Sequence, residues 1–252
     1  MNNNQATLQK LETMGMWGMA RALRQSMEAG SKSELTPDEM VSRLVDAEWD
    51  ERQDRKLARL LQLAHLRYRA GLEDVDFGIK RNLEKNLLMR LADSRWVEDR
   101  QDLILSGPCG CGKSFLASVL GQQACIHGYT VAYWQAGKLF EQLKLCKADG
   151  SYLRELAKLA KKRLIIVDDF GLEVLDTASR LSLLEILEDR HGRASTLIST
   201  QLPVSQWHQV IGDPTIADAV CDRIVHTAHR IELKGESMRK LYSQKTTKKA
   251  KE

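Results

Sequence analysis

The feature that most constrains this chain is the octapeptide GPCGCGKS at positions 107–114, which matches the complete G-x-x-x-x-G-K-[ST] pattern of a phosphate-binding loop. An apolar run at 102–106 predicts a strand before the loop, and a helix is predicted from Lys113 to His127, stopped by Gly128. The glycines let successive backbone N–H groups turn toward a phosphate, and the start of the helix directs the positive end of its dipole at the same place. The sequence therefore predicts a nucleotide site between a strand and a helix.

The positions of the loop have distinct expected roles. Lys113 would bring its charge to the β- and γ-phosphates, and the Ser114 hydroxyl could ligate Mg²⁺. Two of the five cysteines occupy variable positions of the loop, and because the chain has no paired C-x-x-C units we interpret them as small filler rather than as metal ligands or disulfide partners. The expected nucleotide-binding positions are Gly107, Pro108, Cys109, Gly110, Cys111, Gly112, Lys113 and Ser114.

A second apolar run, at 163–168, ends in two carboxylates, Asp168 and Asp169. This is the form of a buried parallel strand with an acidic pair at its carboxyl end, the arrangement known as Walker B. Asp168 is expected to hold the Mg²⁺ shell opposite Ser114. Asp169 can polarise the attacking water, in a position where many related ATPases have the longer Glu.

Five apolar strand candidates alternate with helical stretches from residue 102 onward, at 102–106, 129–134, 163–168, 195–200 and 229–233. Alternation at this spacing predicts the α/β class, with a parallel sheet covered on both faces. In ATPases with an additional strand between the phosphate-loop strand and the acidic strand, that strand presents a polar residue to the γ-phosphate. Gln201 or, failing it, Thr200 is the candidate, although either could simply be a hydrogen-bonded strand end.

The first 75 residues carry a helical pattern and almost no strand signal. One or two short amphipathic helices are expected before residue 30, and Thr36, Pro37 and Glu39 form a strong start for a long helix that should end by Gly71. We therefore expect a small all-α module over 1–75 that docks a partner, and a nucleotide domain over 76–243 that is entered through a helix at 80–94. Residues 244–252 form a basic tail, expected to be disordered, which either adds affinity for a polyanion or is simply solvated.

The composition narrows the class of protein further. No apolar run in the 252 residues approaches the roughly 20 that a membrane span needs, and the first residues lack the apolar region of a signal peptide. We therefore expect a cytoplasmic protein without a membrane partner. The formal net charge of +4 resides mainly in the last 19 residues, because residues 234–252 hold seven basic and two acidic side chains.

Three segments of the chain resemble one family closely. They are GDPTIADAVCDRIVHTAHRIELKGESMRK at 212–240, DDFG at 168–171 and STQLPVSQWH at 199–208. These segments, together with LETMGMWGMARAL and LVDAEWDERQDRKL in the helical module, resemble the IstB-like helper ATPases of bacterial insertion sequences. That family belongs to the AAA+ group and is close to the DnaC-type helicase loaders, so the resemblance implies an AAA+ domain with a five-stranded parallel sheet.

The resemblance also implies an oligomer in which each ATP lies at a subunit boundary. An arginine of the neighbouring subunit then stabilises the charge of phosphoryl transfer, and Arg223 matches this finger. The alternative is that Arg223 merely pairs with Asp218 or Asp222. Arg239 falls where a second sensor acting in cis would lie, although little chain remains to build the lid that usually carries one.

DNA contact is expected in the segment between the second and third strands, which in AAA+ assemblies tends to face the central channel. Residues 144–163 hold seven basic against two acidic side chains, and such segments, stacked in a ring or spiral, would track phosphates without reading bases. A solvated basic helix is the alternative. The candidates are Lys144, Lys147, Arg154, Lys158, Lys161 and Lys162.

The residues and the resemblance together predict a magnesium-dependent, DNA-stimulated ATPase that binds double-stranded DNA without sequence specificity and assists a partner transposase in choosing target DNA. A DnaC-like replicative helicase loader is the alternative with the same motifs. A small-molecule phosphotransferase, or a module that holds ATP without hydrolysing it, would share the phosphate loop but not the whole set.

Overall fold

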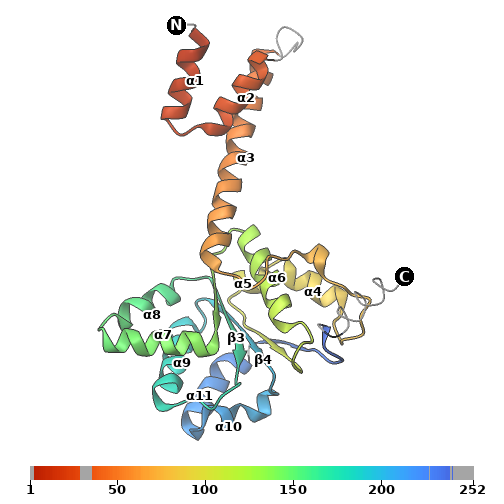
Figure 1. Ribbon diagram of the computed structural model, residues 1–252, viewed down its shortest axis with the longest axis vertical. Coiled ribbons are helices and arrows are strands. Elements are labelled where there is room, and N and C mark those ends of the chain that lie inside the picture. The colour runs from red at the N-terminus through yellow and green to blue at the C-terminus, as the bar shows by residue number, and fades with distance from the viewer. Residues whose placement is uncertain (1–2, 29–35, 227, 239, 241–252) are drawn as a thin grey trace. The chain divides into compact units, whose positions relative to one another are not determined.

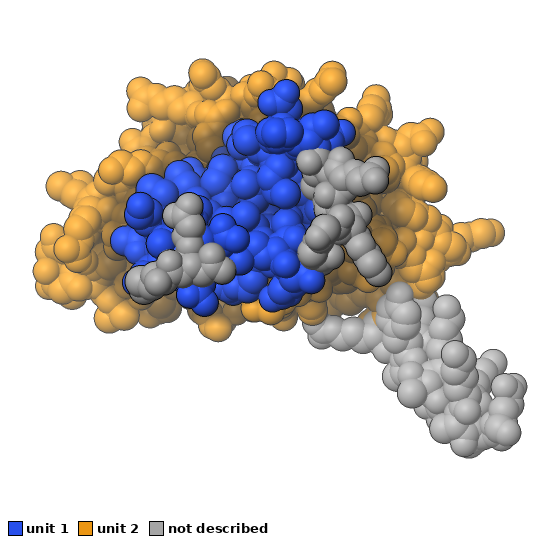
Figure 2. Space-filling view, turned by 90° about the horizontal axis from the view of Figure 1, so that it is seen from above, with its two compact units in different colours: residues 1–59 blue, residues 60–252 orange. Residues whose placement is uncertain are grey.

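The computed structural model describes residues 3–28, 36–226, 228–238 and 240. The chain divides into two compact units, residues 1–59 and 60–252, which Figure 2 colours separately. The division lies before the boundary that we expected near residue 75. Residues 60–75 belong to the second unit, where Ala64, Ala70 and Val75 are buried.

The first unit is helical, as predicted. It contains α1 (Asn3–Thr13), α2 (Trp17–Glu28) and most of α3 (Pro37–Ala64), which continues into the second unit. The predicted capping box at the start of α3 is present: the amide of Glu39 donates to Thr36 Oγ1 at 3.3 Å, and the amide of Thr36 donates to Glu39 Oε2 at 2.7 Å.

A buried carboxylate joins α2 to α3 within this unit. Glu48 of α3 is 5% exposed, and its Oε2 accepts hydrogen bonds from the amides of Gly18 at 2.9 Å and Met19 at 3.4 Å, in the first turn of α2. Amides at the start of a helix lack partners within the helix, and the helix dipole favours a negative charge there. Arg52 binds the other oxygen, so the carboxylate is satisfied on both sides.

The second unit is built on a sheet of five parallel strands in the order β2-β3-β4-β1-β5. The strands are β1 (Leu103–Ser106), β2 (Val131–Gln135), β3 (Leu164–Phe170), β4 (Ser195–Thr200) and β5 (His229–Glu232). All five predicted strands are confirmed. The sheet places β4 between the strand that leads into the phosphate loop and the strand that ends in the acidic pair, as the additional strand requires.

Ten helical segments complete the described part of this unit beyond α3 (Figure 1). They are η2 (Leu72–Asp74), α4 (Lys85–Ala92), α5 (Arg95–Glu98), α6 (Lys113–Ile126), α7 (Ala136–Ala148), α8 (Tyr152–Ala160), α9 (Thr177–Arg190), η3 (Val204–Gln206), α10 (Trp207–Ile211) and α11 (Pro214–Val225). Helix α4 begins later than the predicted residue 80, because the preceding chain bonds to the chain at the end of β5: Asn82 Nδ2 donates to Glu232 O, and Arg81 O accepts from the main-chain amide of Lys234.

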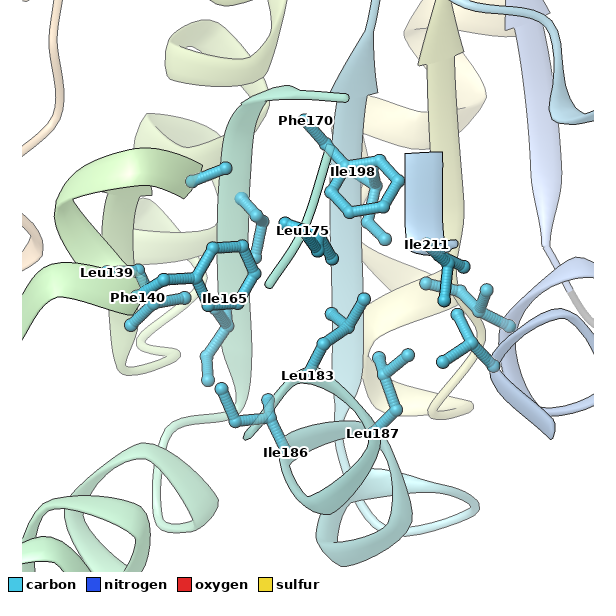
Figure 3. Close-up of a cluster of buried hydrophobic side chains, with 14 of the residues drawn as sticks. Leu139, Phe140, Ile165, Phe170, Leu175, Leu183, Ile186, Leu187, Ile198 and Ile211 are labelled. Atoms are coloured by element: carbon cyan, nitrogen blue, oxygen red, sulfur yellow. The ribbon is translucent and has the colours of Figure 1, made fainter. Parts of the chain in front are cut away.

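Helices cover both faces of the sheet. On one face, Ile165 and Ile198 lie in a cluster with Leu139 of α7 and Leu183 of α9 (Figure 3). On the other face, α6 lies so close to β3 that a Cβ on Gly121 would come within 2.8 Å of Ile166 Cδ1. Because both faces are covered, the central part of β3 (Leu164–Val167) is a continuous apolar run and every residue of β4 is buried. Among the described residues, no helix is both long and apolar enough to traverse a bilayer.

Candidate functional site

A cavity of about 670 Å³ lies at the carboxyl end of the sheet, beside the phosphate loop. Its wall contains five residues of the predicted loop together with both Asp169 and Gln201, which come from other strands. The sequence motifs therefore meet at one place. The lining residues are Arg67, Tyr68, Arg69, Ala70, Asp74, Asp76, Arg81, Cys109, Gly110, Gly112, Lys113, Ser114, Phe115, Asp169, Leu172, Gln201 and Met238.

The loop has the backbone that its glycines predict. Gly107 and Gly112 have φ angles of +142° and +97°, a region that L-residues with side chains rarely adopt, and a Cβ on Gly107 would lie 2.3 Å from Leu233 O. Lys113 is 5% exposed and its Nζ donates to Gly107 O at 2.7 Å and to Pro108 O at 2.9 Å. The ammonium is thus held inside the loop by carbonyl groups that phosphate oxygens could replace.

The two loop cysteines differ in their surroundings. Cys111 is fully buried, whereas Cys109 is exposed and lines the cavity. The described part of the chain contains no cluster of three or more His, Cys, Asp or Glu residues that could hold a metal ion by themselves.

The acidic pair at the end of β3 is bound by two side chains that the motifs did not indicate. Asp168 is fully buried, and its Oδ2 accepts hydrogen bonds from the Tyr133 hydroxyl and from Arg67 Nη1, the latter at 3.2 Å. The same Arg67 nitrogen lies 3.1 Å from Asp169 Oδ2. Burial and the hydrogen bond to Asp168 both raise the pKa of Tyr133, so its hydroxyl stays protonated and donates.

A bulge brings the two carboxylates together. Val167 pairs with Ile198 and Phe170 pairs with Thr200, so β3 has one residue more than β4 over this stretch. Asp169 takes the left-handed conformation, with φ of +58°, which Asp and Asn tolerate better than other residues with side chains. In a regular strand, consecutive side chains point to opposite faces. The bulge instead lets both carboxylates reach one guanidinium.

The residues present fit a magnesium ion delivered with a nucleotide. Asp168 Oδ1 is buried and has no hydrogen-bond partner among the described residues, and Ser114 lines the adjoining cavity. Mg²⁺ typically takes only one or two protein ligands and fills the remaining positions with phosphate oxygens and water. A carboxylate oxygen and a hydroxyl are suitable donors, so no larger acidic cluster is needed.

The two candidates for contact with the γ-phosphate, Thr200 and Gln201, differ in their access to the cavity. Thr200 is fully buried, and its Oγ1 accepts a hydrogen bond from the Leu202 amide at 3.1 Å. Gln201 lines the cavity. The geometry therefore favours Gln201 for contact with a phosphate. Arg239 lies outside the described residues, although the neighbouring Met238 lines the cavity and its amide donates to Gly110 O at 2.9 Å.

The finger candidate Arg223 lies on α11 and does not line the cavity of its own chain. Its guanidinium forms an ion pair with Glu188 and donates to Ala219 O at 2.9 Å. The partners that we considered, Asp218 and Asp222, are therefore not its ion-pair partners. The Arg223 side chain retains 25% exposure, so one side of the guanidinium faces solvent.

The six basic candidates for DNA contact lie on α7, on α8 and directly after α8. Three are engaged locally: Lys144 pairs with Glu141 and Asp176, Lys158 pairs with Glu155, and the Lys147 ammonium lies 4.4 Å from the centre of the Tyr152 ring. Arg154 and Lys161 are exposed, and Lys162 is half-buried. The six residues lie in one segment of the chain, and none of them lines the cavity.

Sequence reasoning missed Arg67 and Tyr133. Tyr133 is one of three residues with a hydroxyl in the predicted strand at 129–134, and nothing in the sequence distinguishes it from the other two. Arg67 lay within the long helix that was predicted to end by Gly71, and nothing in its neighbours along the chain connects it with a carboxylate 101 positions later. Only the folded chain brings them together.

Comparison with known proteins identifies the family of this chain. The family described as "IstB-like ATP binding protein" matches residues 7–246. A putative insertion sequence ATP-binding protein of Sinorhizobium fredii is 47% identical over 234 residues, covering 93% of this chain and 96% of that protein. A putative ATP-binding protein of a Pseudomonas fluorescens insertion sequence is 41% identical, covering 80% and 87%.

The fold is similar to that of DnaI, with a TM-score of 0.55 at 22% identity over 70% of this chain and 93% of DnaI. The strand order and this likeness place the second unit among the AAA+ P-loop folds. The match over nearly the whole length and the assembled phosphate-loop site lead to one conclusion: the chain belongs to the family of IstB-like ATP-binding proteins.

Proposed function

We propose that this chain is an ATP-dependent AAA+ ATPase that binds DNA without sequence specificity and assists a partner transposase in selecting target DNA during transposition. One observation carries the proposal: the phosphate loop, Asp169 and Gln201 line a single cavity, and Arg67 of the same wall contacts the buried Asp168, in a chain whose relatives are named insertion sequence ATP-binding proteins. A loop that only joined a strand to a helix would not require the acidic pair or the additional strand.

The residues around the cavity divide the work of hydrolysis among them. Lys113 would leave the carbonyls of the loop and contact the β- and γ-phosphates. Ser114 and Asp168 would hold Mg²⁺, which when bound shields the charge of the phosphates. Asp169 would accept a hydrogen bond from the attacking water, while Gln201 orients it.

Subunit assembly would complete the site. Arg223 does not line the cavity of its own chain, and its side chain is partly exposed, so its guanidinium could exchange Glu188 for the phosphates of a second copy. An arginine that reaches the phosphates from a neighbour ties ATP binding to oligomer formation, because it makes its contacts only when both are present. ATP is therefore expected to favour assembly on DNA, and hydrolysis to release it.

The test measures binding of a DNA duplex, and the mass of the complex, with and without ATP. Wild type should assemble and bind more tightly with ATP, whereas Arg223→Ala should lose this response. Arg230→Ala is the matched control, because Arg230 is also an arginine bonded to a main-chain carbonyl, that of Val225. An ATP response that is absent in wild type, or retained in full by Arg223→Ala, contradicts the proposal.

The DNA surface has its own test. Reversing two exposed charges, Arg154→Glu with Lys161→Glu, should weaken duplex binding for all sequences alike and reduce the slope of log K against log salt by about 2 per subunit. Arg90→Glu with Arg95→Glu is the control, because both residues are exposed, on α4 and α5, and the double variant has the same total charge as the test variant. The control should keep the wild-type slope. Equal effects from both pairs would assign DNA binding to net charge alone.

A second candidate, a replicative helicase loader, is favoured by the likeness of the fold to the DnaC helicase loader, with a TM-score of 0.50 at 16% identity over 59% of this chain and 86% of that chain. Its ATPase site would use the same residues. Capture experiments with the full chain separate the two, because a transposase is expected under the first proposal and a hexameric helicase under the second. Phosphate release that duplex DNA stimulates, with no acceptor molecule present, would exclude a small-molecule kinase.

A further inference from the structure

One guanidinium bridges the two carboxylates at the end of β3. Arg67 Nη1 lies 3.2 Å from Asp168 Oδ2 and 3.1 Å from Asp169 Oδ2. The Asp168 side chain is fully buried, whereas Arg67 and Asp169 keep 31% and 25% exposure. A charge-assisted contact to a buried carboxylate is among the stronger hydrogen bonds in proteins.

This contact stands in conflict with the metal-binding role of Asp168. A guanidinium and a divalent cation repel each other strongly at the distance that one carboxylate would impose on them. When Asp168 accepts Mg²⁺, its ion pair with Arg67 must therefore weaken or break. The nucleotide-free site already has a cation of its own.

The backbone around Arg67 is anchored to α6. Leu66 Cδ2 lies within 2.8 Å of where a Cβ on Gly121 would be, so this side chain fits a gap that only glycine leaves. The Tyr68 amide donates to Ser118 Oγ at 3.3 Å, and the rings of Tyr68 and Phe115 lie 6.0 Å apart. Any displacement of Arg67 is therefore a rotation of its long, partly exposed side chain rather than a movement of the segment.

We propose that Arg67 is a tethered cation that neutralises Asp168 through Oδ2 when no nucleotide is bound and yields only to a metal ion that arrives with nucleotide phosphates. A bare metal ion would have to displace the guanidinium from Asp168 and would offer it no anion in exchange, so Arg67 would keep Asp169 alone of the two carboxylates. A metal–nucleotide complex brings phosphate oxygens into the cavity that Arg67 lines, so the displaced guanidinium gains a new anion. Arg67 thereby makes metal binding conditional on nucleotide, and the coupling is reciprocal.

This inference rests on the proposed nucleotide site, with Asp168 as the metal ligand. The Tyr133 hydroxyl, which bonds the same oxygen, does not carry a charge and can remain in place when a metal binds. Arg67 alone therefore supplies the competition. A matched control is at hand, because Arg69 lines the same cavity and, among the described residues, forms no ion pair with either aspartate.

The experiment titrates the full-length chain with Mn²⁺ and follows the electron paramagnetic resonance signal of the free ion, without nucleotide and with saturating ADP. Without nucleotide, Arg67→Gln should bind Mn²⁺ about tenfold to a hundredfold more tightly than wild type, the range that corresponds to loss of one charge-assisted contact. Arg69→Gln should match wild type. With ADP, the gap between Arg67→Gln and wild type should shrink, because the wild-type guanidinium then has phosphates to bind.

Unchanged or weaker nucleotide-free binding of Mn²⁺ by Arg67→Gln overturns the inference, since Arg67 would then support the site instead of competing for it. Arg67→Lys covers the case in which the Gln variant fails to fold, because it keeps the charge and should keep the weak nucleotide-free binding of wild type. If wild type binds Mn²⁺ with ADP, and Arg67→Gln matches wild type both with and without ADP, the role of Arg67 is refuted. The proposed nucleotide site is not contradicted by that result. Wild type that binds no nucleotide refutes the proposed function itself.

Discussion

A buried arginine at the end of α9 provides the sharpest stability prediction. Arg190 is 1% exposed, and its Nη1 donates to the carbonyls of Leu159 at 2.9 Å and Lys162 at 2.8 Å, at the end of α8. Nη2 donates to Ser195 O, and Nε lies 3.3 Å from Thr196 Oγ1. Carbonyls at the end of a helix lack partners within the helix, so this side chain satisfies them and ties α8 to β4.

Replacing Arg190 with Met keeps most of the volume and removes every donor. Each buried acceptor left unsatisfied costs roughly 1–3 kcal/mol, and relief from burying a charge offsets part of the sum. Burial lowers the pKa of Arg190 to about 10, so the side chain remains charged at neutral pH and that relief is real. We expect a net loss of about 4 kcal/mol in the free energy of unfolding. Arg190→Lys keeps the charge but not the planar set of guanidinium donors, and its free energy of unfolding should fall by less.

Urea unfolding measures this loss if the signal comes from the second unit alone. Trp96 and Trp207 are buried there, whereas Trp17 and Trp49 of the first unit are exposed and can be replaced by Phe. With a slope of about 2 kcal/mol per molar urea, the fluorescence midpoint of Arg190→Met should fall by about 2 M. A shift below about 0.5 M would refute the reasoning, because it would mean that water satisfies the freed carbonyls.

Three further predictions concern the same unit. Hydrogen bonds from Ser179 and the ammonium of Lys144 lower the pKa of Asp176 to about 2. The stabilising effect of Asp176 is therefore present above the unfolded value of 3.8 and disappears as the pH falls through 2. The difference in melting temperature between wild type and Asp176→Ala should shrink over that range. Cys109 should be alkylated at neutral pH and protected by ATP, whereas burial raises the pKa of Cys125 to about 11 and should leave it unreactive; mass spectrometry of the labelled peptides checks both. Gly121→Ala should destabilise the second unit by about 1–3 kcal/mol, measured by the same urea titration, because the new Cβ has no space between α6 and β3.

The sequence alone predicted what depends on residues near one another in the chain. The phosphate loop requires glycines at fixed positions, and the observed φ angles of Gly107 and Gly112 show why. The strands were found because both faces of a parallel sheet are apolar, and the capping box at Thr36 because its two partners are three residues apart. These signals are local, so one sequence is enough to read them.

The tertiary structure decided everything that joins distant residues. Alternation along a strand would place Asp168 and Asp169 on opposite faces, and only the bulge in β3, set by pairing with β4, brings both to one guanidinium. The chain from residue 60 to 75 belongs to the nucleotide-binding unit because it packs there, although its sequence continues the helical pattern that precedes it. Eight consecutive residues were therefore enough to predict the phosphate loop. Arg67, the counter-ion of the acidic pair, was found only in the folded chain, because no local rule relates an arginine to a carboxylate 101 residues away.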